Sequence, residues 1–80
     1  MFTVYILRSK RDLKRYIGCT SNLQRRFDEH NKGLVKSTKY RRPLELIYTE
    51  EFESKSKAME RENYFKSGRG REYLNYLLKI

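Results

Sequence analysis

Two short apolar runs near the N-terminus constrain what this chain can fold into more than any other feature. In Phe2–Leu7 the side chains alternate between two faces, as in a β-strand, and Arg15–Cys19 has the same character. Because only the charged segment Ser9–Lys14 separates these runs, the pattern predicts an antiparallel hairpin. Such a hairpin places Tyr5 and Tyr16 on neighbouring strands.

The rest of the chain alternates between helical and extended patterns. Ser21 and Gln24 form a capping-box signature at the start of the first helix, and Ser67–Gly70 predicts a helix break. The expected helix, strand, helix and helix cover Ser21–Asn31, Leu44–Phe52, Ser54–Lys66 and Arg71–Lys79. The resulting order, β-β-α-β-α-α, predicts an α+β fold.

Length and composition favour a single cytoplasmic domain. The 80 residues predict one domain over 1–80, with a small core. The single cysteine, Cys19, excludes an intramolecular disulfide and suits a reducing cytosol. We find neither an apolar segment long enough to span a bilayer nor the pattern of a signal peptide, so we expect no membrane partner.

The charge balance favours a polyanionic partner. Lys and Arg number 19 against 10 Asp and Glu, a net charge of +9. A well-hydrated surface also explains such a charge, but tyrosines are interleaved with the basic clusters, which is typical of nucleic-acid binding. The candidate nucleic-acid contacts are Arg25, Lys39, Tyr40, Arg41, Arg42 and Lys66.

Three polar residues fall on or beside the apolar stripes of the expected helices. His30 shares a helix face with Leu23 and Phe27, Arg26 lies at the edge of that face, and Glu62 lies within the second helix's stripe. A buried polar side chain is costly unless it has a partner or a function. Glu62 therefore either pairs with a buried cation such as Arg26 or binds a metal ion.

These residues together resemble the GIY-YIG endonuclease superfamily, most closely its short stand-alone bacterial, UPF0213-like members. Tyr16-Ile17-Gly18 matches the second motif intact, and Thr3-Val4-Tyr5 matches the first with Thr in place of Gly. Arg26 precedes an apolar residue and stands four residues before a histidine, as in that family. The segment Ala58–Lys66 matches the pattern Ala-x-x-x-Glu-x-x-x-Lys.

The resemblance implies a three-stranded antiparallel sheet flanked by helices. It also implies a divalent-metal-dependent endonuclease that hydrolyses DNA phosphodiester bonds in repair or recombination. The catalytic residues would be Tyr5, Tyr16, Arg26, His30 and Glu62. Glu62 would hold one Mg²⁺ or Mn²⁺ ion. Which tyrosine acts as the base stays open, as does the substrate: duplex, branched, damaged or single-stranded DNA, or RNA.

Two alternatives keep the same fold. Family nucleases usually carry a second domain for target recognition, which favours a non-catalytic nucleic-acid-binding module here. A nuclease subunit that needs a protein partner for target recognition is the other alternative, with the aromatic and apolar segment Tyr73–Ile80 as a contact surface. Structural explanations also exist for single residues, because half-buried strand tyrosines and a lone core histidine are common.

Overall fold

β1 (Phe2–Ser9) is the central strand of a three-stranded antiparallel sheet. It pairs with β2 (Arg15–Thr20) along one edge and with β3 (Leu44–Phe52) along the other, which gives the order β2-β1-β3. The computed structural model describes residues 1–79. Because helices cover both faces of the sheet, the central residues of β1 are all buried. The predicted hairpin, fold class and element order are confirmed.

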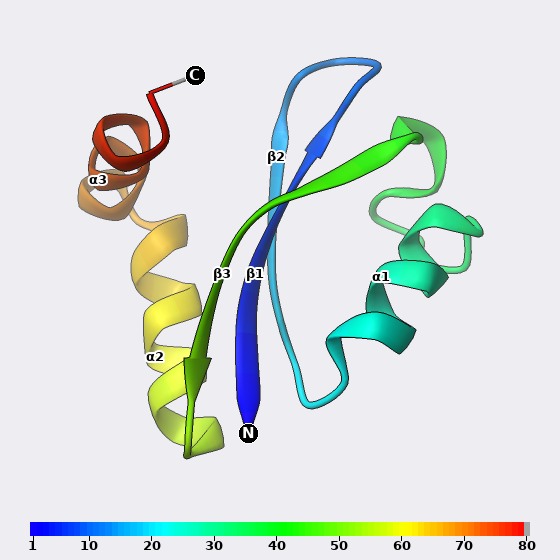
Figure 1. Cartoon of the computed structure of the whole chain (residues 1–80). Coiled ribbons are helices and arrows are strands. Elements are labelled where there is room, and N and C mark those ends of the chain that lie inside the picture. The colour runs from blue at the N-terminus through cyan, green and yellow to red at the C-terminus, as the bar shows by residue number, and fades with distance from the viewer. Residues whose placement is uncertain (80) are drawn as a thin grey trace.

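The helices are divided between the two faces of the sheet. α1 (Leu23–Asn31) covers one face, and α2 (Lys55–Lys66) with α3 (Gly68–Leu78) covers the other (Figure 1). A short 3₁₀ helix, η1 (Lys39–Arg41), lies in the connection between α1 and β3. Of the helices in the described part of the chain, none is long and apolar enough to cross a membrane.

Each face of the sheet has its own cluster of buried side chains. The cluster under α2 and α3 is built from Val4, Ile6, Ala58, Phe65 and Leu74. The cluster under α1 is built from Tyr5, Leu7 and Leu44, with Tyr16, Leu23 and Phe27 packed against it. Burial of each large apolar side chain contributes about 1.5–3 kcal/mol, so these two layers account for most of the driving force for folding.

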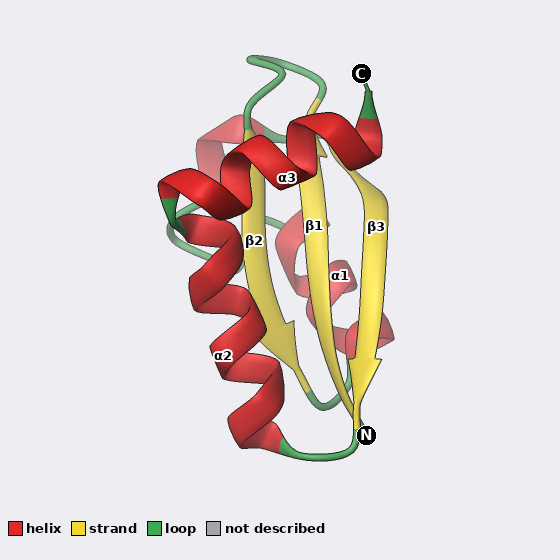
Figure 2. Ribbon diagram, turned by 90° about the vertical axis from the view of Figure 1, so that its left-hand side faces the viewer, coloured by secondary structure: helices red, strands yellow, loops and turns green. Residues whose placement is uncertain are grey.

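Several helix details differ from the sequence-based expectation. The N-cap of α1 is Asn22, whose side chain accepts a hydrogen bond from the backbone N–H of Arg25, so Ser21 is not the cap. α3 begins at Gly68 because Ser67 both ends α2 and caps α3 (Figure 2). A Cβ at Gly70 would overlap the carbonyl oxygen of Tyr64, so this glycine lets the two helices join at close range.

The 3.6-residue period predicts an apolar stripe of Ala58, Met59 and Phe65 on α2, with Arg61 nearer solvent, and this prediction is only partly correct. Ala58 and Phe65 are buried, but Met59 is 45% exposed. Arg61, expected near solvent, is instead half-buried and bonds Glu50 of β3 at 2.8 and 3.2 Å. Pairing with a carboxylate on the adjacent strand lets the long Arg61 side chain cover apolar surface that a periodicity argument assigns to Met59.

Candidate active site

The two tyrosines of the hairpin lie side by side on the sheet face that α1 covers. In the register of β1 and β2, Tyr5 lies opposite Gly18 and Tyr16 opposite Leu7, so the tyrosines are diagonal neighbours. Their ring centroids are 6.3 Å apart. Tyr5 is buried and Tyr16 is half-buried. The prediction that the hairpin brings them together is therefore confirmed.

The absence of a side chain at Gly18 provides the space that the Tyr5 ring occupies. A Cβ at position 18 would overlap the hydroxyl oxygen of Tyr5, and the Cζ and Cε1 atoms are nearly as close. The phenol ring therefore extends from β1 over the backbone of β2. Gly18 thus lets the Tyr5 side chain approach the backbone of β2 closely, and this contact fixes the direction of the Tyr5 hydroxyl.

His30, from the last turn of α1, is buried against both tyrosines. Its Nε2 lies 2.9 Å from the hydroxyl oxygen of Tyr5, and its Nδ1 lies 2.8 Å from Oγ1 of Thr38. The centroid of the His30 ring is 4.9 Å from that of Tyr16. Both ring nitrogens thus have a hydrogen-bonding partner, and the imidazole is held in one orientation.

Arg26 lies one turn before His30 on the same helix. Its guanidinium donates a hydrogen bond to Glu29 at 3.1 Å, and this bond is the main reason that the pKa of Arg26 is raised. The Arg26 side chain is 37% exposed. Because the phenols of Tyr5 and Tyr16 also favour its charged form, Arg26 presents a permanent positive charge to the tyrosine pair.

Burial sets the protonation of the central pair. It raises the pKa of Tyr5 to about 12, although the nearby Arg26 guanidinium opposes this rise. Burial, assisted by the charge of Arg26, lowers the pKa of His30 to about 4. At neutral pH the pair therefore consists of a neutral phenol and a neutral imidazole.

Glu62 belongs to α2, on the opposite side of the sheet from α1. Its side chain is only 18% exposed and bonds Nζ of Lys66 at 2.7 Å. Of the two alternatives for Glu62, the pairing with Arg26 is wrong, because Glu62 bonds Lys66 one turn along the same helix and Arg26 bonds Glu29. The Glu62 carboxylate nevertheless raises the pKa of Tyr5, so its field reaches the phenol across the edge of the sheet.

The residues around Glu62 fit only one kind of metal site. Within residues 1–79 no group of three or more His, Cys, Asp or Glu side chains could enclose a metal ion. A single carboxylate suits an ion such as Mg²⁺, which retains several waters and takes further oxygens from a substrate phosphate. Lys66 would then have to release Glu62, or share it with the ion.

Residues 1–75, which carry all of these side chains, match the family model of the GIY-YIG catalytic domain. The chain belongs to the GIY-YIG family. Membership in this nuclease family agrees with the Tyr5, Tyr16, Arg26, His30 and Glu62 pattern, and the roles assigned to these residues remain predictions.

Proteins similar to this GIY-YIG chain come from archaea and bacteria. A UPF0213 protein of Natronomonas pharaonis is 49% identical over 65 residues, covering 80% of this chain and 75% of that protein. The UPF0213 protein YazA of Bacillus subtilis is 46% identical, covering 78% of this chain and 63% of that protein. A solution NMR structure of a UPF0213 protein from Bacillus halodurans is 40% identical, with a TM-score of 0.59, covering 96% of this chain and 85% of that chain.

The predicted nucleic-acid contacts of this GIY-YIG domain are not equally available. Arg25 and Tyr40 are exposed, and Nζ of Lys39 lies 5.4 Å from the centre of the Tyr40 ring. Arg41 and Arg42 instead bond other groups of the protein: Arg41 bonds Asp12 of the β1–β2 loop at 3.2 Å, and Arg42 bonds the carbonyl of Lys39 at 2.9 Å. Lys66 is paired with Glu62.

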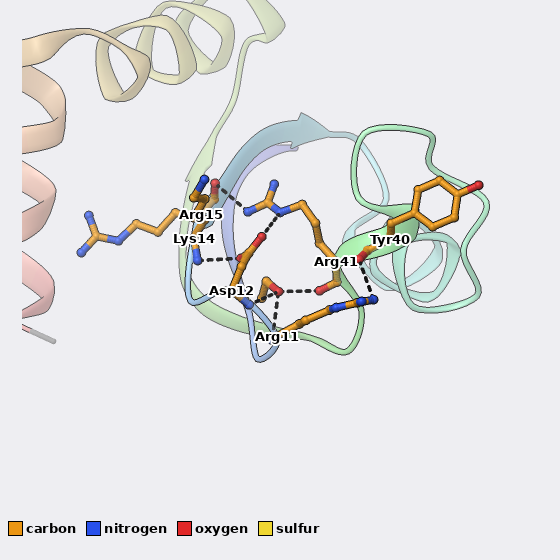
Figure 3. Close-up of polar contacts among 7 residues, drawn as sticks. Arg11, Asp12, Lys14, Arg15, Tyr40 and Arg41 are labelled. Carbon is orange, nitrogen blue, oxygen red and sulfur yellow. Dashed lines mark hydrogen bonds and ion pairs between the residues drawn. The ribbon is translucent and has the colours of Figure 1, made fainter.

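The loop between β1 and β2 is a second basic region, outside the predicted nucleic-acid contacts. Arg11 bonds the carbonyl of Tyr40, and Arg41 bonds both Asp12 and the carbonyl of Arg15 (Figure 3). These bonds fix the β1–β2 loop against η1. The sequence shows the charged segment between β1 and β2, but only the tertiary contacts show that this loop and η1 form one surface.

A pocket of about 560 Å³ adjoins the tyrosine pair at Tyr16. This size lies within the range of small-molecule and cofactor sites. Its lining combines apolar and basic side chains: Tyr16, Leu74, Lys14, Arg15, Lys66 and Arg71. The pocket therefore connects the hairpin with Lys66 and with the start of α3 through positively charged surface.

Proposed function

We propose that this chain is a divalent-metal-dependent endonuclease that hydrolyses phosphodiester bonds in DNA. The observation that carries the proposal is the convergence of Tyr5, Tyr16 and His30, with Arg26 beside them. A phenolate can accept a proton, an imidazole can accept or orient one, and a guanidinium can bind a phosphate. The combination suits phosphoryl chemistry better than acyl transfer, because no activated serine or thiol nucleophile is present in this group.

In the proposed reaction a water oxygen forms a bond to phosphorus while the bond from phosphorus to the 3′ oxygen breaks. Tyr5 or Tyr16 first loses its own proton to solvent and then, as the phenolate, takes the proton of the water, and the departing 3′ oxygen takes a proton from solvent. Arg26 stabilises the charge that grows on the non-bridging oxygens. His30 holds the hydroxyl of Tyr5 in place at 2.9 Å.

Glu62 is the residue that would hold Mg²⁺ or Mn²⁺. Such an ion supplies charge stabilisation to the departing oxygen and favours the deprotonated form of nearby groups. A cation near Glu62 would also oppose the influence of this carboxylate on Tyr5, whose pKa the carboxylate raises. Lys66, at 2.7 Å from Glu62, is the ion-pair partner of the carboxylate when no ion is bound.

The basic loops supply the proposed path for the DNA backbone. Hydrogen bonds hold the β1–β2 loop, which carries Arg11 and Lys14, against η1, which carries the exposed Tyr40. Ordered loops lose little entropy when DNA binds, and an exposed aromatic ring offers a surface on which a base can stack.

The test is a cleavage assay on labelled single-stranded, duplex, flap and four-way-junction DNA with Mg²⁺ or Mn²⁺. Glu62→Ala is the active-site variant, and Glu60→Ala is its matched control because Glu60 is exposed on the same helix. Cleavage by the parent and by E60A, but not by E62A, supports the proposal. Equal cleavage by all three would point to a contaminating nuclease.

The two alternative functions give different results in the same experiment. A binding module would retain DNA in a mobility-shift assay without cleaving any substrate. A subunit that needs a partner would gain cleavage on addition of cell lysate, and would lose that cleavage in E62A. If the isolated chain neither binds nor cleaves any of these DNAs, with or without lysate, the proposed function is refuted.

A further inference from the structure

Thr38 is a buried polar residue for which neither the family motifs nor the proposed reaction has a role. It lies in the segment before η1, and its side chain is fully buried. Its backbone is anchored at both ends, by N–H donation to Val35 and by acceptance from the N–H of Arg41. The Oγ1 atom is thereby fixed 2.8 Å from Nδ1 of His30.

Thr38, His30 and Tyr5 form a chain of two hydrogen bonds. The bonds join Oγ1 of Thr38 to Nδ1, and Nε2 to the hydroxyl oxygen of Tyr5. Each neutral group has one polar hydrogen, so the chain has one more hydrogen than it has hydrogen bonds. The direction in which the two hydrogen bonds are donated decides whether Thr38 or Tyr5 keeps the extra hydrogen.

The two directions differ in what surrounds the extra hydrogen. If Tyr5 donates to Nε2, the ring donates from Nδ1 to Thr38, and the Thr38 hydrogen is left over. Within residues 1–79, Thr38 Oγ1 has no hydrogen-bond partner other than His30, so that hydrogen would be buried without an acceptor. Such a group is costly.

In the opposite direction the extra hydrogen is on the Tyr5 hydroxyl. Arg26, which acts on that hydroxyl through a side-chain hydrogen bond, is 37% exposed, and the neighbouring Tyr16 is half-buried, so this end of the hydrogen-bond chain borders groups that solvent reaches. A water molecule or a substrate oxygen at the site can accept this hydrogen.

We propose that Thr38 is a positioning residue that holds His30 in the tautomer with its ring proton on Nε2, donated to the hydroxyl oxygen of Tyr5. The tautomer itself does not depend on the proposed nuclease function, and only its effect on catalysis rests on that function. When Tyr5 loses its own proton, the Nε2–H already points at the phenolate, and Arg26 adds a second favourable interaction. Thr38 therefore acts on Tyr5 through His30.

The tautomer can be measured directly because His30 is the only histidine in the chain. In protein labelled with ¹⁵N-histidine, long-range ¹H–¹⁵N spectra at neutral pH give one pair of ring-nitrogen signals. We expect the shift of a protonated nitrogen for Nε2 and that of an unprotonated nitrogen for Nδ1. A proton on Nδ1 in the wild-type protein would overturn the proposal.

Thr38→Val and Thr38→Ser separate the hydroxyl from the shape of the side chain. Thr38→Val removes the donor, so we expect the two ring-nitrogen shifts to move toward intermediate values as both tautomers become populated. Thr38→Ser keeps the hydroxyl and should retain the wild-type shifts. Thermal melting checks that each variant is folded, and if T38V does not fold, the wild-type spectrum and T38S decide the question.

Cleavage gives the second readout. We expect T38V to lower kcat on the order of 10- to 100-fold with little change in KM, the range typical when a partner that orients a functional histidine is lost. T38S should retain most of the rate. A T38V variant with unchanged ring shifts and unchanged kcat would refute the role. If the wild-type chain cleaves no substrate, the proposed function fails while the spectrum still decides the tautomer.

Discussion

Replacement of Gly18 by alanine tests whether the Tyr5 ring lies over β2. The φ angle of Gly18 is not positive, in contrast to Gly33 at 79°, so the backbone itself accepts a Cβ. The Cβ would, however, overlap the hydroxyl end of the Tyr5 ring. That ring is 1% exposed and hydrogen-bonded to His30, so it cannot move into solvent without loss of both contacts.

The expected cost follows from two opposing terms. Overpacking of a well-packed site costs about 1–3 kcal/mol. Removal of a glycine from a strand interior offsets roughly 0.5–1 kcal/mol of that. Because the new Cβ would overlap three atoms of a buried ring, the upper part of the overpacking range applies, about 2–3 kcal/mol. We therefore expect Gly18→Ala to lower the free energy of unfolding by about 1–2.5 kcal/mol, which lowers Tm by roughly 4–20 °C in a domain of this size.

A double-mutant cycle isolates the contact. Tyr5→Leu removes the ring atoms that would meet the new Cβ, so in that background Gly18→Ala should be neutral or stabilising by about 0.5–1 kcal/mol. Gly68→Ala is the control elsewhere in the chain, because a Cβ there meets no atom within 4 Å and the change favours the helix.

The assay is urea or thermal unfolding followed by circular dichroism, with the four variants of the cycle measured under identical conditions. The coupling between positions 5 and 18 should be positive and at least about 1 kcal/mol. A G18A protein as stable as its parent, or an equal cost of G18A in both backgrounds, would show that the Tyr5 ring does not occupy this space.

Four further outcomes are expected. Because burial lowers the pKa of His30 to about 4, up to about 3 kcal/mol of stability present above pH 6.5 should be lost as the pH falls toward 4. A plot of Tm against pH should show this loss, and His30→Asn should flatten it. Arg26→Lys should lower kcat by about 10²-fold or more, because the planar fork is lost, whereas Arg25→Lys in the same cleavage assay should have little effect. Arg61→Ala should lower the free energy of unfolding by about 1–2 kcal/mol in urea titrations, since it breaks two bonds to Glu50, and an unchanged midpoint would count against this pair. DNA affinity, measured by fluorescence anisotropy, should fall by about 10³-fold or more between 50 and 200 mM salt if six or more phosphate contacts form, and a flat response would argue against nucleic acid.

The regular elements could be predicted because their signals are local. Alternation of apolar residues identified β1 and β2, and the 3.6-residue period identified α1, independently of the rest of the chain. Element ends were less predictable where two signals competed. Ser21 and Asn22 are both good caps, and only the observed bond to the N–H of Arg25 distinguishes them.

The relation of Glu62 to its partners could not be predicted from periodicity. A carboxylate on an apolar stripe indicates that a partner is needed, but it does not identify the partner. Arg26 and Glu62 lie on helices that cover opposite faces of the sheet, so their pairing is excluded by topology rather than by helix phase. Thr38 carried no signal at all, because a threonine in a basic loop is ordinarily exposed.

The sequence by itself determined the order of the elements, the α+β class and the group of polar residues that need partners, since each follows from local spacing and from the cost of burying polar atoms. Only the tertiary structure decided that Tyr5 lies over Gly18, that His30 joins Tyr5 to Thr38, and that the β1–β2 loop meets η1. These contacts join residues far apart in the chain, and their existence depends on sheet register and on the face that each helix covers.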